Sequence, residues 1–276
     1  MAVGVQYFTD PACVWSWSTE PKIRKLMVEF GDSLAWTYVM GGLARTYQLP
    51  AEREKHIIEW LEAAGESGMP VDPRIWTEGP ISSTFPACMA VKAAAEQAPD
   101  RGGAYLRALR EGIICFRRKL DTTEALVGEA RGVKLDVERF RIDLGSHAIV
   151  EAFGEDIEAT RTVSDDARER GGATMGQSGE RLVFPTVVFG GSHAVYGPQP
   201  YEAYREAALA AGASPAAAGP PGVLEAVKRF GRMAPAEVVE VCELPEPRAE
   251  LELWQLASEW KLRPLKVLTG VLWELT

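Results

Sequence analysis

The first 40 residues carry the patterns of a strand, a helix and a second strand in succession. Residues 3–8 alternate loosely between apolar and polar side chains, which predicts a strand that ends at Thr9-Asp10-Pro11. A helix is predicted over residues 13–30, with a kink at Pro21. Its apolar side chains repeat at the spacing of a buried helix face: Ile23, Leu26, Met27 and Phe30. β-Branched and aromatic residues at 34–40 predict the second strand, so a right-handed crossover should join two parallel strands.

Between about residues 51 and 170 the patterns are nearly all helical. Helices are predicted over residues 51–66, 86–97, 103–118, 122–131, 136–144 and 146–170. Two short strands are then predicted at 181–189 and 193–196, and Gly190-Gly191 between them is a hairpin signal. A further helix is expected over 198–211. The chain therefore predicts a sheet that is interrupted by a helical insert.

The last quarter of the chain predicts a small separate module. Residues 212–222 are rich in Ala, Gly and Pro and are interpreted as a linker. Beyond them, three short helices are predicted (223–230, 235–241 and 247–260), followed by strand residues at 265–275. Three helices and a strand pair resemble a winged-helix unit. This tail has seven basic and nine acidic side chains, which argues against DNA binding and favours packing, a protein contact or a homodimer.

Composition and charge exclude several classes of protein. The 276 residues are 46% hydrophobic and 25% charged, typical of a globular chain, and the net charge of −9 makes nucleic acid an improbable partner. The N-terminus lacks a signal-peptide pattern, and no run of about 18 apolar residues predicts a membrane span. We therefore expect a cytoplasmic protein without membrane contact.

The four cysteines and three histidines show no pairing or ligand spacing, so neither a disulfide framework nor a metal site is expected. Cys13 differs from the others because it lies where the first strand passes into the first helix. A thiolate in the first turn of a helix is stabilised by free N–H groups, which predicts a lowered pKa and a nucleophile; the alternative is a small buried apolar residue.

Pro185 interrupts a central-strand pattern, so it should begin a strand or have a cis peptide bond.

Four motifs together resemble the DsbA-like branch of the thioredoxin superfamily, in particular the cytoplasmic FrnE-like proteins. The motifs are Asp10-Pro11 before Cys13-Val14-Trp15-Ser16-Trp17, Glu20-Pro21, Ser82-Ser83-Thr84-Phe85-Pro86-Ala87, and Phe184-Pro185-Thr186. The resemblance covers about residues 3–211 and implies an α/β architecture: a thioredoxin fold with a large helical insert, followed by the small C-terminal α/β appendage. The corresponding parts are a first βαβ half (1–43), the insert (44–176), a second half with the cis-proline strand (177–211), the linker (212–222) and the module (223–276).

The resemblance also implies roles for individual residues. Cys13 corresponds to the attacking cysteine, Phe184, Pro185 and Thr186 correspond to the cis-proline loop of a substrate groove, and Trp15 and Trp17 would flank that groove. Position 16 departs from the family pattern, since most active members have a second cysteine where this chain has Ser16. Cys13 can therefore form a mixed disulfide but cannot resolve it locally. Ser16 could donate a hydrogen bond to the Cys13 thiolate, or could serve only as a helix cap.

Three activities are compatible with this variant site. The main hypothesis is a thiol-disulfide oxidoreductase or monothiol exchange protein that acts through Cys13 on protein or glutathione disulfides, with glutathione as a co-substrate and no tightly bound cofactor. A glutathione-dependent transferase or isomerase like the kappa class is a second possibility. The third is a non-catalytic adaptor that holds a protein partner in the groove. Cys88 is expected in the core, although an insert helix could bring it over the site.

Overall fold

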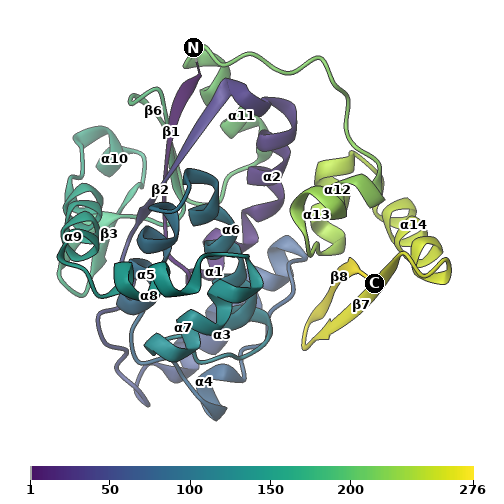
Figure 1. Ribbon diagram of the computed structural model, residues 1–276. Coiled ribbons are helices and arrows are strands. Elements are labelled where there is room, and N and C mark those ends of the chain that lie inside the picture. The colour runs from purple at the N-terminus through teal and green to yellow at the C-terminus, as the bar shows by residue number, and fades with distance from the viewer. Residues whose placement is uncertain (1) are drawn as a thin grey trace.

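A mixed four-stranded sheet forms the centre of the computed structural model, which describes residues 2–276 (Figure 1). Its strand order is β2-β1-β5-β6, with bounds β1 Val3–Thr9, β2 Leu34–Met40, β5 Thr186–Phe189 and β6 His193–Tyr196. β1 and β2 are parallel, as predicted, and β5 and β6 run antiparallel to their neighbours. The apolar face predicted for the first helix is largely confirmed: Ile23, Leu26 and Phe30 are buried beside Val5 and Tyr7 of β1.

The single kinked helix predicted over residues 13–30 is wrong, because the structure has two helices there. α1 (Val14–Ser18) ends at Thr19, whose N–H bonds the Trp17 carbonyl, and α2 (Glu20–Glu29) then begins. Pro21 lies in the first turn of α2, where its missing N–H costs no helical hydrogen bond. The proline therefore starts a new helix instead of bending an existing one.

The insert is helical, as predicted, although two of its helices break. Its helices are α3 Arg53–Ser67, α4 Ile75–Glu78, α5 Phe85–Ala95, α6 Pro99–Arg110, α7 Thr123–Gly132, α8 Val137–Leu144, α9 His147–Arg161 and α10 Asp165–Glu169. The predicted helix 103–118 is wrong at its end, because α6 passes into a π-helical turn, η2 (Glu111–Cys115). The predicted helix 146–170 is also wrong: Ser164 is extended and accepts from the N–H of Ala167, so α10 starts anew after α9.

A hairpin that the sequence pattern does not predict precedes the last sheet strands. β3 (Ala173–Gly176) pairs with β4 (Gly179–Leu182), and the predicted strand 181–189 is broken between β4 and β5. The Phe184–Pro185 peptide bond at this break is cis. α11 (Tyr201–Ala210) then packs on β5 and β6, and residues 211–222 lead away without regular structure.

The C-terminal module consists of three helices and a hairpin: α12 Val223–Phe230, α13 Pro235–Cys242, α14 Glu246–Ser258, β7 Leu262–Val267 and β8 Gly270–Leu275. The strand residues predicted over 265–275 form a strand pair, as the winged-helix resemblance implies, because a turn at Leu268 and Thr269 divides them; the first strand begins earlier than predicted, at Leu262. The module has its own core, in which Met233, Leu253 and Trp273 are buried. None of the helices in residues 2–276 is long and apolar enough to cross a membrane.

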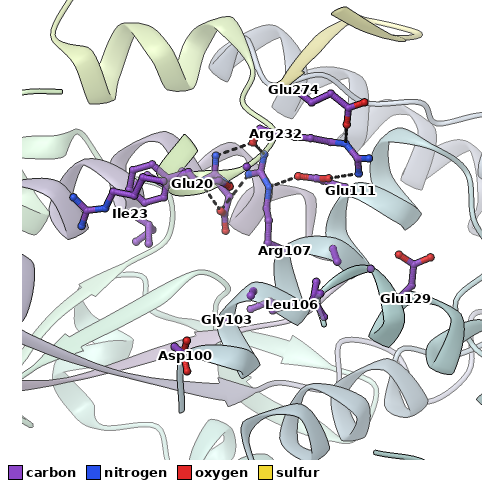
Figure 2. Close-up of a pocket in the computed structure, with 18 of the residues that line it drawn as sticks. Glu20, Ile23, Asp100, Gly103, Leu106, Arg107, Glu111, Glu129, Arg232 and Glu274 are labelled. Atoms are coloured by element: carbon purple, nitrogen blue, oxygen red, sulfur yellow. Dashed lines mark hydrogen bonds and ion pairs between the residues drawn. The ribbon is translucent and has the colours of Figure 1, made fainter. Parts of the chain in front are cut away.

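Two contacts between the module and the rest of the chain join its opposite ends to α2 and to the insert. α13 packs along α2, and the β7-β8 turn meets the insert, where Thr269 and Val71 exchange backbone and side-chain hydrogen bonds of 2.8 to 3.2 Å. Between these contacts lies a cleft of about 1220 Å³, bounded by α2, β2, the insert helices α6 and α7, and the module (Figure 2). The module is thus held against both α2 and the insert, and an open cleft lies beside it.

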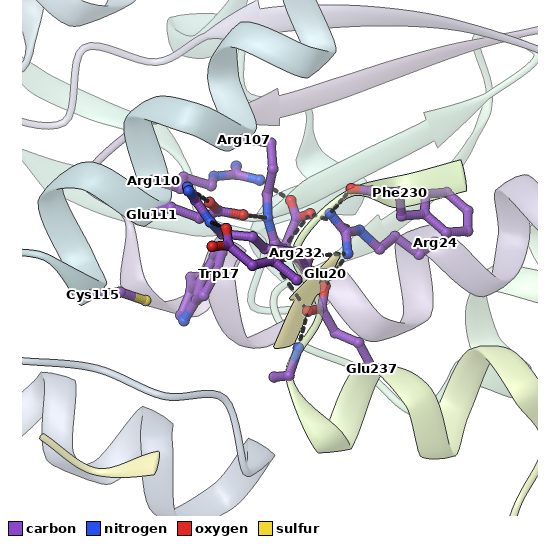
Figure 3. Close-up of polar contacts among 12 residues, drawn as sticks. Trp17, Glu20, Arg24, Arg107, Arg110, Glu111, Cys115, Phe230, Arg232 and Glu237 are labelled. Atoms are coloured by element: carbon purple, nitrogen blue, oxygen red, sulfur yellow. Dashed lines mark hydrogen bonds and ion pairs between the residues drawn. The ribbon is translucent and has the colours of Figure 1, made fainter. Parts of the chain in front are cut away.

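Buried ion pairs fix the first of these contacts (Figure 3). Glu237 of α13 is fully buried and accepts from Arg107 at 2.8 and 3.0 Å, and it pairs with Arg24 at 3.0 Å. Arg24 also donates to the carbonyls of Phe230 and Arg232. Burial alone would raise the pKa of Glu20, but Arg110, Arg107 and Arg24 hold it below its ordinary range. The buried Glu20 carboxylate is therefore held in its charged form, and both Glu20 and Glu237 are paired with guanidinium groups.

Replacing Glu237 with Ala leaves Arg24 and Arg107 buried without their shared carboxylate. We expect a loss of about 3–5 kcal/mol in the free energy of unfolding, together with faster proteolysis of the linker, because the module loosens. Glu240→Ala is the matched control on the same helix, since the half-buried Glu240–Lys25 pair at 3.5 Å should contribute at most about 1 kcal/mol. Urea titration and limited proteolysis measure both effects, and equal losses in the two variants would show that Glu237 does not anchor the module.

Candidate functional site

The predicted cysteine lies against the cis-proline loop. Cys13 is the N-cap of α1, and its Sγ accepts a hydrogen bond from the Ser16 N–H at 3.4 Å. The same thiol donates to the carbonyl oxygen of Phe184, 171 residues away in the chain, at 3.8 Å. The fold therefore brings together Cys13, Ser16 and Phe184-Pro185. Their roles in chemistry stay predictions.

The predicted fall in the Cys13 pKa is wrong. Cys13 is only 5% exposed, and burial raises the pKa of its thiol; the nearby Asp10 and Glu59 carboxylates raise it further, while the hydrogen bond from the Ser16 N–H lowers it. The loss of hydration is the largest of these effects, so the helix start does not lower the pKa as predicted. The sulfur is therefore held as a thiol in an apolar setting.

The two tryptophans of the motif differ in position. Trp15 is partly buried near the site, and its Nε1 donates to Glu59 of α3 at 3.0 Å. Trp17 is fully buried, donates to the Pro70 carbonyl and lies under the Arg107 guanidinium at 4.2 Å. The prediction that Trp17 flanks the groove is therefore wrong, because its side chain packs into the insert. Trp17 belongs to the interior between α1 and α6.

The cis-proline loop itself is closed over the sulfur. Phe184, Pro185 and Thr186 are all buried, and the Thr186 hydroxyl donates to the Val183 carbonyl at 2.7 Å instead of facing a groove. The Phe184 ring fills the space above Gly41, where an added Cβ would lie 2.0 Å from the ring. The structure thus places the predicted groove residues beside Cys13 but shows no open surface at them.

The unpredicted β3-β4 hairpin covers this loop from outside. The Arg181 guanidinium of β4 stacks on the Phe184 ring at 4.3 Å from its centroid. At the hairpin turn, the Gln177 side chain accepts from the Arg45 N–H at 3.0 Å and donates to the Thr46 carbonyl at 2.7 Å. The hairpin is therefore tied across the site to the segment after β2 and helps to cover the loop beside Cys13.

A buried carboxylate behind Cys13 is a feature that the sequence pattern did not reveal. Asp10 accepts from the N–H groups of Ala12 and Leu43 at 2.9 and 2.7 Å, and the Cys88 thiol donates to it at 3.3 Å. Burial raises the pKa of Asp10 and of Cys88. In the sequence, only the Asp10-Pro11 motif pointed to this carboxylate, because its partner Cys88 lies in α5, far along the chain. Cys88 is in the core, as predicted, and its thiol is engaged.

The chemistry available at the site follows from this geometry. All four cysteines are free, and position 16 offers a hydroxyl whose oxygen is buried without a hydrogen-bond partner among the described residues. A disulfide formed at Cys13 would have no thiol beside it for release. Because burial also disfavours the thiolate, the site is poorly suited to attack on a disulfide in this closed state.

Alkylation of Cys13 by iodoacetamide reports directly on the raised pKa. At neutral pH the native thiol should react more slowly than the same cysteine in the unfolded chain, because less of it is thiolate and the hairpin covers it. The rate should rise only as the pH exceeds the ordinary cysteine range. Mass spectrometry of the Cys13 peptide gives the rate, and rapid labelling below neutral pH would refute the assignment.

Substitution of Gly41 tests whether Phe184 closes the site. In Gly41→Ala the new methyl group overlaps the Phe184 ring, so the ring must move at a cost of about 1–3 kcal/mol and alkylation of Cys13 should become faster. Gly65→Ala is the control, since an added Cβ meets nothing within 4 Å there and should stabilise α3 by up to about 1 kcal/mol. Unchanged alkylation in a destabilised Gly41→Ala protein would show that Phe184 does not limit access.

Curated relatives match nearly the whole chain. The ClpXP adapter protein SpxH of Halalkalibacterium halodurans is 28% identical over 280 residues, which cover 96% of this chain and 86% of that protein. SpxH of Bacillus subtilis is 27% identical over 281 residues, covering 98% and 88%. With so little of the chain left unmatched, both similarities extend through the C-terminal module.

A solved structure shares the fold of the larger part. The cytosolic disulfide reductase DsbM of Pseudomonas aeruginosa, determined with GSH, superimposes with a TM-score of 0.56 at 19% identity. The superposition covers 75% of this chain and 99% of the DsbM chain, so a quarter of this chain has no counterpart there.

A family model described as thioredoxin matches residues 7–164, which is more than half of the chain. The chain therefore belongs to the thioredoxin family, and its thioredoxin fold contains a helical insert.

Proposed function

We propose that this protein is an adaptor that binds a protein substrate and presents it to an ATP-dependent protease of the ClpXP type. The thioredoxin-family domain serves as a binding scaffold in this proposal, and Cys13 is not required. The expected partners are therefore proteins: the substrate and the protease. Among the three activities compatible with the Cys13 site, this is the non-catalytic one.

The state of Cys13 is the observation that carries the proposal. Its thiol is 5% exposed with a raised pKa, and residue 16 is a serine. Turnover of a disulfide needs an accessible thiolate and a second thiol to release the product. Both requirements are unmet at Cys13, so a function that depends on binding explains the site better than one that depends on exchange.

The C-terminal module supports the same proposal. The similarity to SpxH proteins, which are named as ClpXP adapters, extends over 96% and 98% of this chain, whereas a disulfide reductase of the same fold covers 75%. In this structure the module is held by the ion pairs that the fully buried Glu237 forms with Arg24 and Arg107. A rigidly held extra module adds binding surface without adding chemistry to Cys13.

Monothiol exchange is the second candidate, favoured by one observation. Cys13 caps α1 opposite the Phe184 carbonyl, which is a position from which a sulfur could meet an extended substrate if the hairpin opened. Glutathione would then be the resolving thiol. A cytoplasmic location, where thiols stay reduced, is proposed in either case and agrees with four free cysteines.

Protein half-lives in cells that lack this chain test the proposal. Pulse-labelling should reveal at least one protein that is degraded severalfold more slowly without the chain, and equally slowly without the protease. Cys13→Ala should restore rapid degradation, because no exchange step is involved. Purified protease, ATP, chain and that protein should then reproduce the effect.

The thiol-exchange candidate predicts the opposite pattern. Cys13→Ala would behave like loss of the whole chain, and a mixed disulfide on Cys13 would be recovered from cells by mass spectrometry. Absence of any protein with a longer half-life would rule out the adaptor role regardless of Cys13.

A further inference from the structure

We propose that the cleft between the module and the thioredoxin-family domain binds an acidic segment of the partner protein. This inference deepens the proposed function, on which it rests, by naming the surface and the chemistry of the segment that it recognises. The cleft lies on a different face of the domain from the closed Cys13 loop, since its lining residues do not include Cys13 or residues 184–186.

The size and walls of the cleft suit a polypeptide. Its volume of about 1220 Å³ exceeds the roughly 300–1,000 Å³ typical of small-molecule pockets. Met27 of α2 and Trp36 of β2 form part of one wall, and Phe230 and Leu265 of the module form part of another. These apolar side chains provide contact area for a bound peptide. They come from both the thioredoxin-family domain and the module.

The lining reverses the charge balance of the chain. Six arginines and five carboxylates line the cleft, whereas the whole chain has 30 basic and 39 acidic side chains. Figure 2 shows Arg107 beside Glu20 and Glu111, and Arg232 between Glu111 and Glu274. These inner charges neutralise one another, so the charge presented to a ligand depends on the outer ones.

The outer ion pairs expose their cations and bury their anions. Arg263 keeps 62% of its side-chain surface, while its partner Glu274 keeps 14%. Arg118 keeps 41%, while Glu129 keeps 12%. Asp100 is the exposed carboxylate of the lining. A ligand that enters the cleft therefore meets guanidinium groups before carboxylates.

Arg229 adds a cation that no carboxylate neutralises. Its partners within residues 2–276 are the Met27 carbonyl, at 2.8 Å, and the Phe230 ring, at 5.1 Å from its centroid. The side chain is exposed at the rim of the cleft and retains donors for a ligand. An acidic segment with apolar residues matches both the free guanidinium and the apolar walls. Attraction at this site acts against the repulsion expected between a chain of net charge −9 and an acidic partner.

Selection from a phage-displayed library of random peptides on the intact immobilised chain tests the recognition chemistry. We expect enrichment of peptides that combine Asp or Glu with large apolar residues. In fluorescence anisotropy, Arg229→Glu should bind such a peptide about tenfold more weakly than the wild type, because the free cation is replaced by an anion. Lys228→Glu is the matched control, with the same charge change on the same helix at a residue outside the lining, and should bind like the wild type.

The outcomes separate this inference from the adaptor role. Enrichment of basic or uncharged peptides, or binding that Arg229→Glu leaves unchanged in a folded protein, would overturn the cleft assignment even if degradation still depends on the chain. Dimerisation of the chain that Arg229→Glu abolishes would also overturn it, since a second copy would then occupy the cleft. If acidic peptides bind as expected but no degradation depends on the chain, the adaptor role fails and the cleft stands.

Discussion

The buried charges between α2, α6 and α13 constrain the whole molecule. Each of these charged groups loses its hydration on burial. A buried ion pair offsets that cost only when all of its hydrogen-bonding partners are in place, so it contributes little net stability otherwise. The pairs formed by Glu237 with Arg24 and Arg107 are complete only when the module lies in one orientation on α2. The network therefore contributes mainly to conformational specificity. It favours one orientation of the module on α2 and so fixes the shape of the cleft beside it.

The same network also reaches the Cys13 loop. Arg110, next to Glu20, donates to the Thr9 hydroxyl at the end of β1. The following residue, Asp10, holds the N–H groups of Ala12 and Leu43. A continuous set of polar contacts thus joins the module to the segment that contains Cys13. The two candidate functional regions of the protein are parts of one packed unit.

Local patterns predicted much of the fold, and they failed where distant residues decide the outcome. The apolar spacing of Ile23, Leu26 and Phe30 records burial against β1, so it was visible in the sequence. The β3-β4 hairpin has few apolar residues and is held by Gln177, whose partners lie about 130 residues away. No local pattern encodes such contacts.

The electrostatics of the site were hidden for the same reason. The position of Cys13 at a helix start favours a thiolate, and that much can be read from sequence. Its burial under Phe184 and Arg181 depends on tertiary packing, and burial is the larger effect. The charge network was equally hidden, because Arg107 and Glu237 are 130 residues apart. The thioredoxin fold is therefore retained here around a cysteine whose surroundings oppose redox chemistry.

The most direct test of binding through the cleft, and not through Cys13, is hydrogen–deuterium exchange. Exchange is measured on the intact chain alone and in complex with its partner protein. We predict slower exchange in residues 223–232 and 262–275 and in β2, with little change in residues 10–17 and 183–187. Protection confined to the Cys13 and cis-proline segments would contradict binding through the cleft.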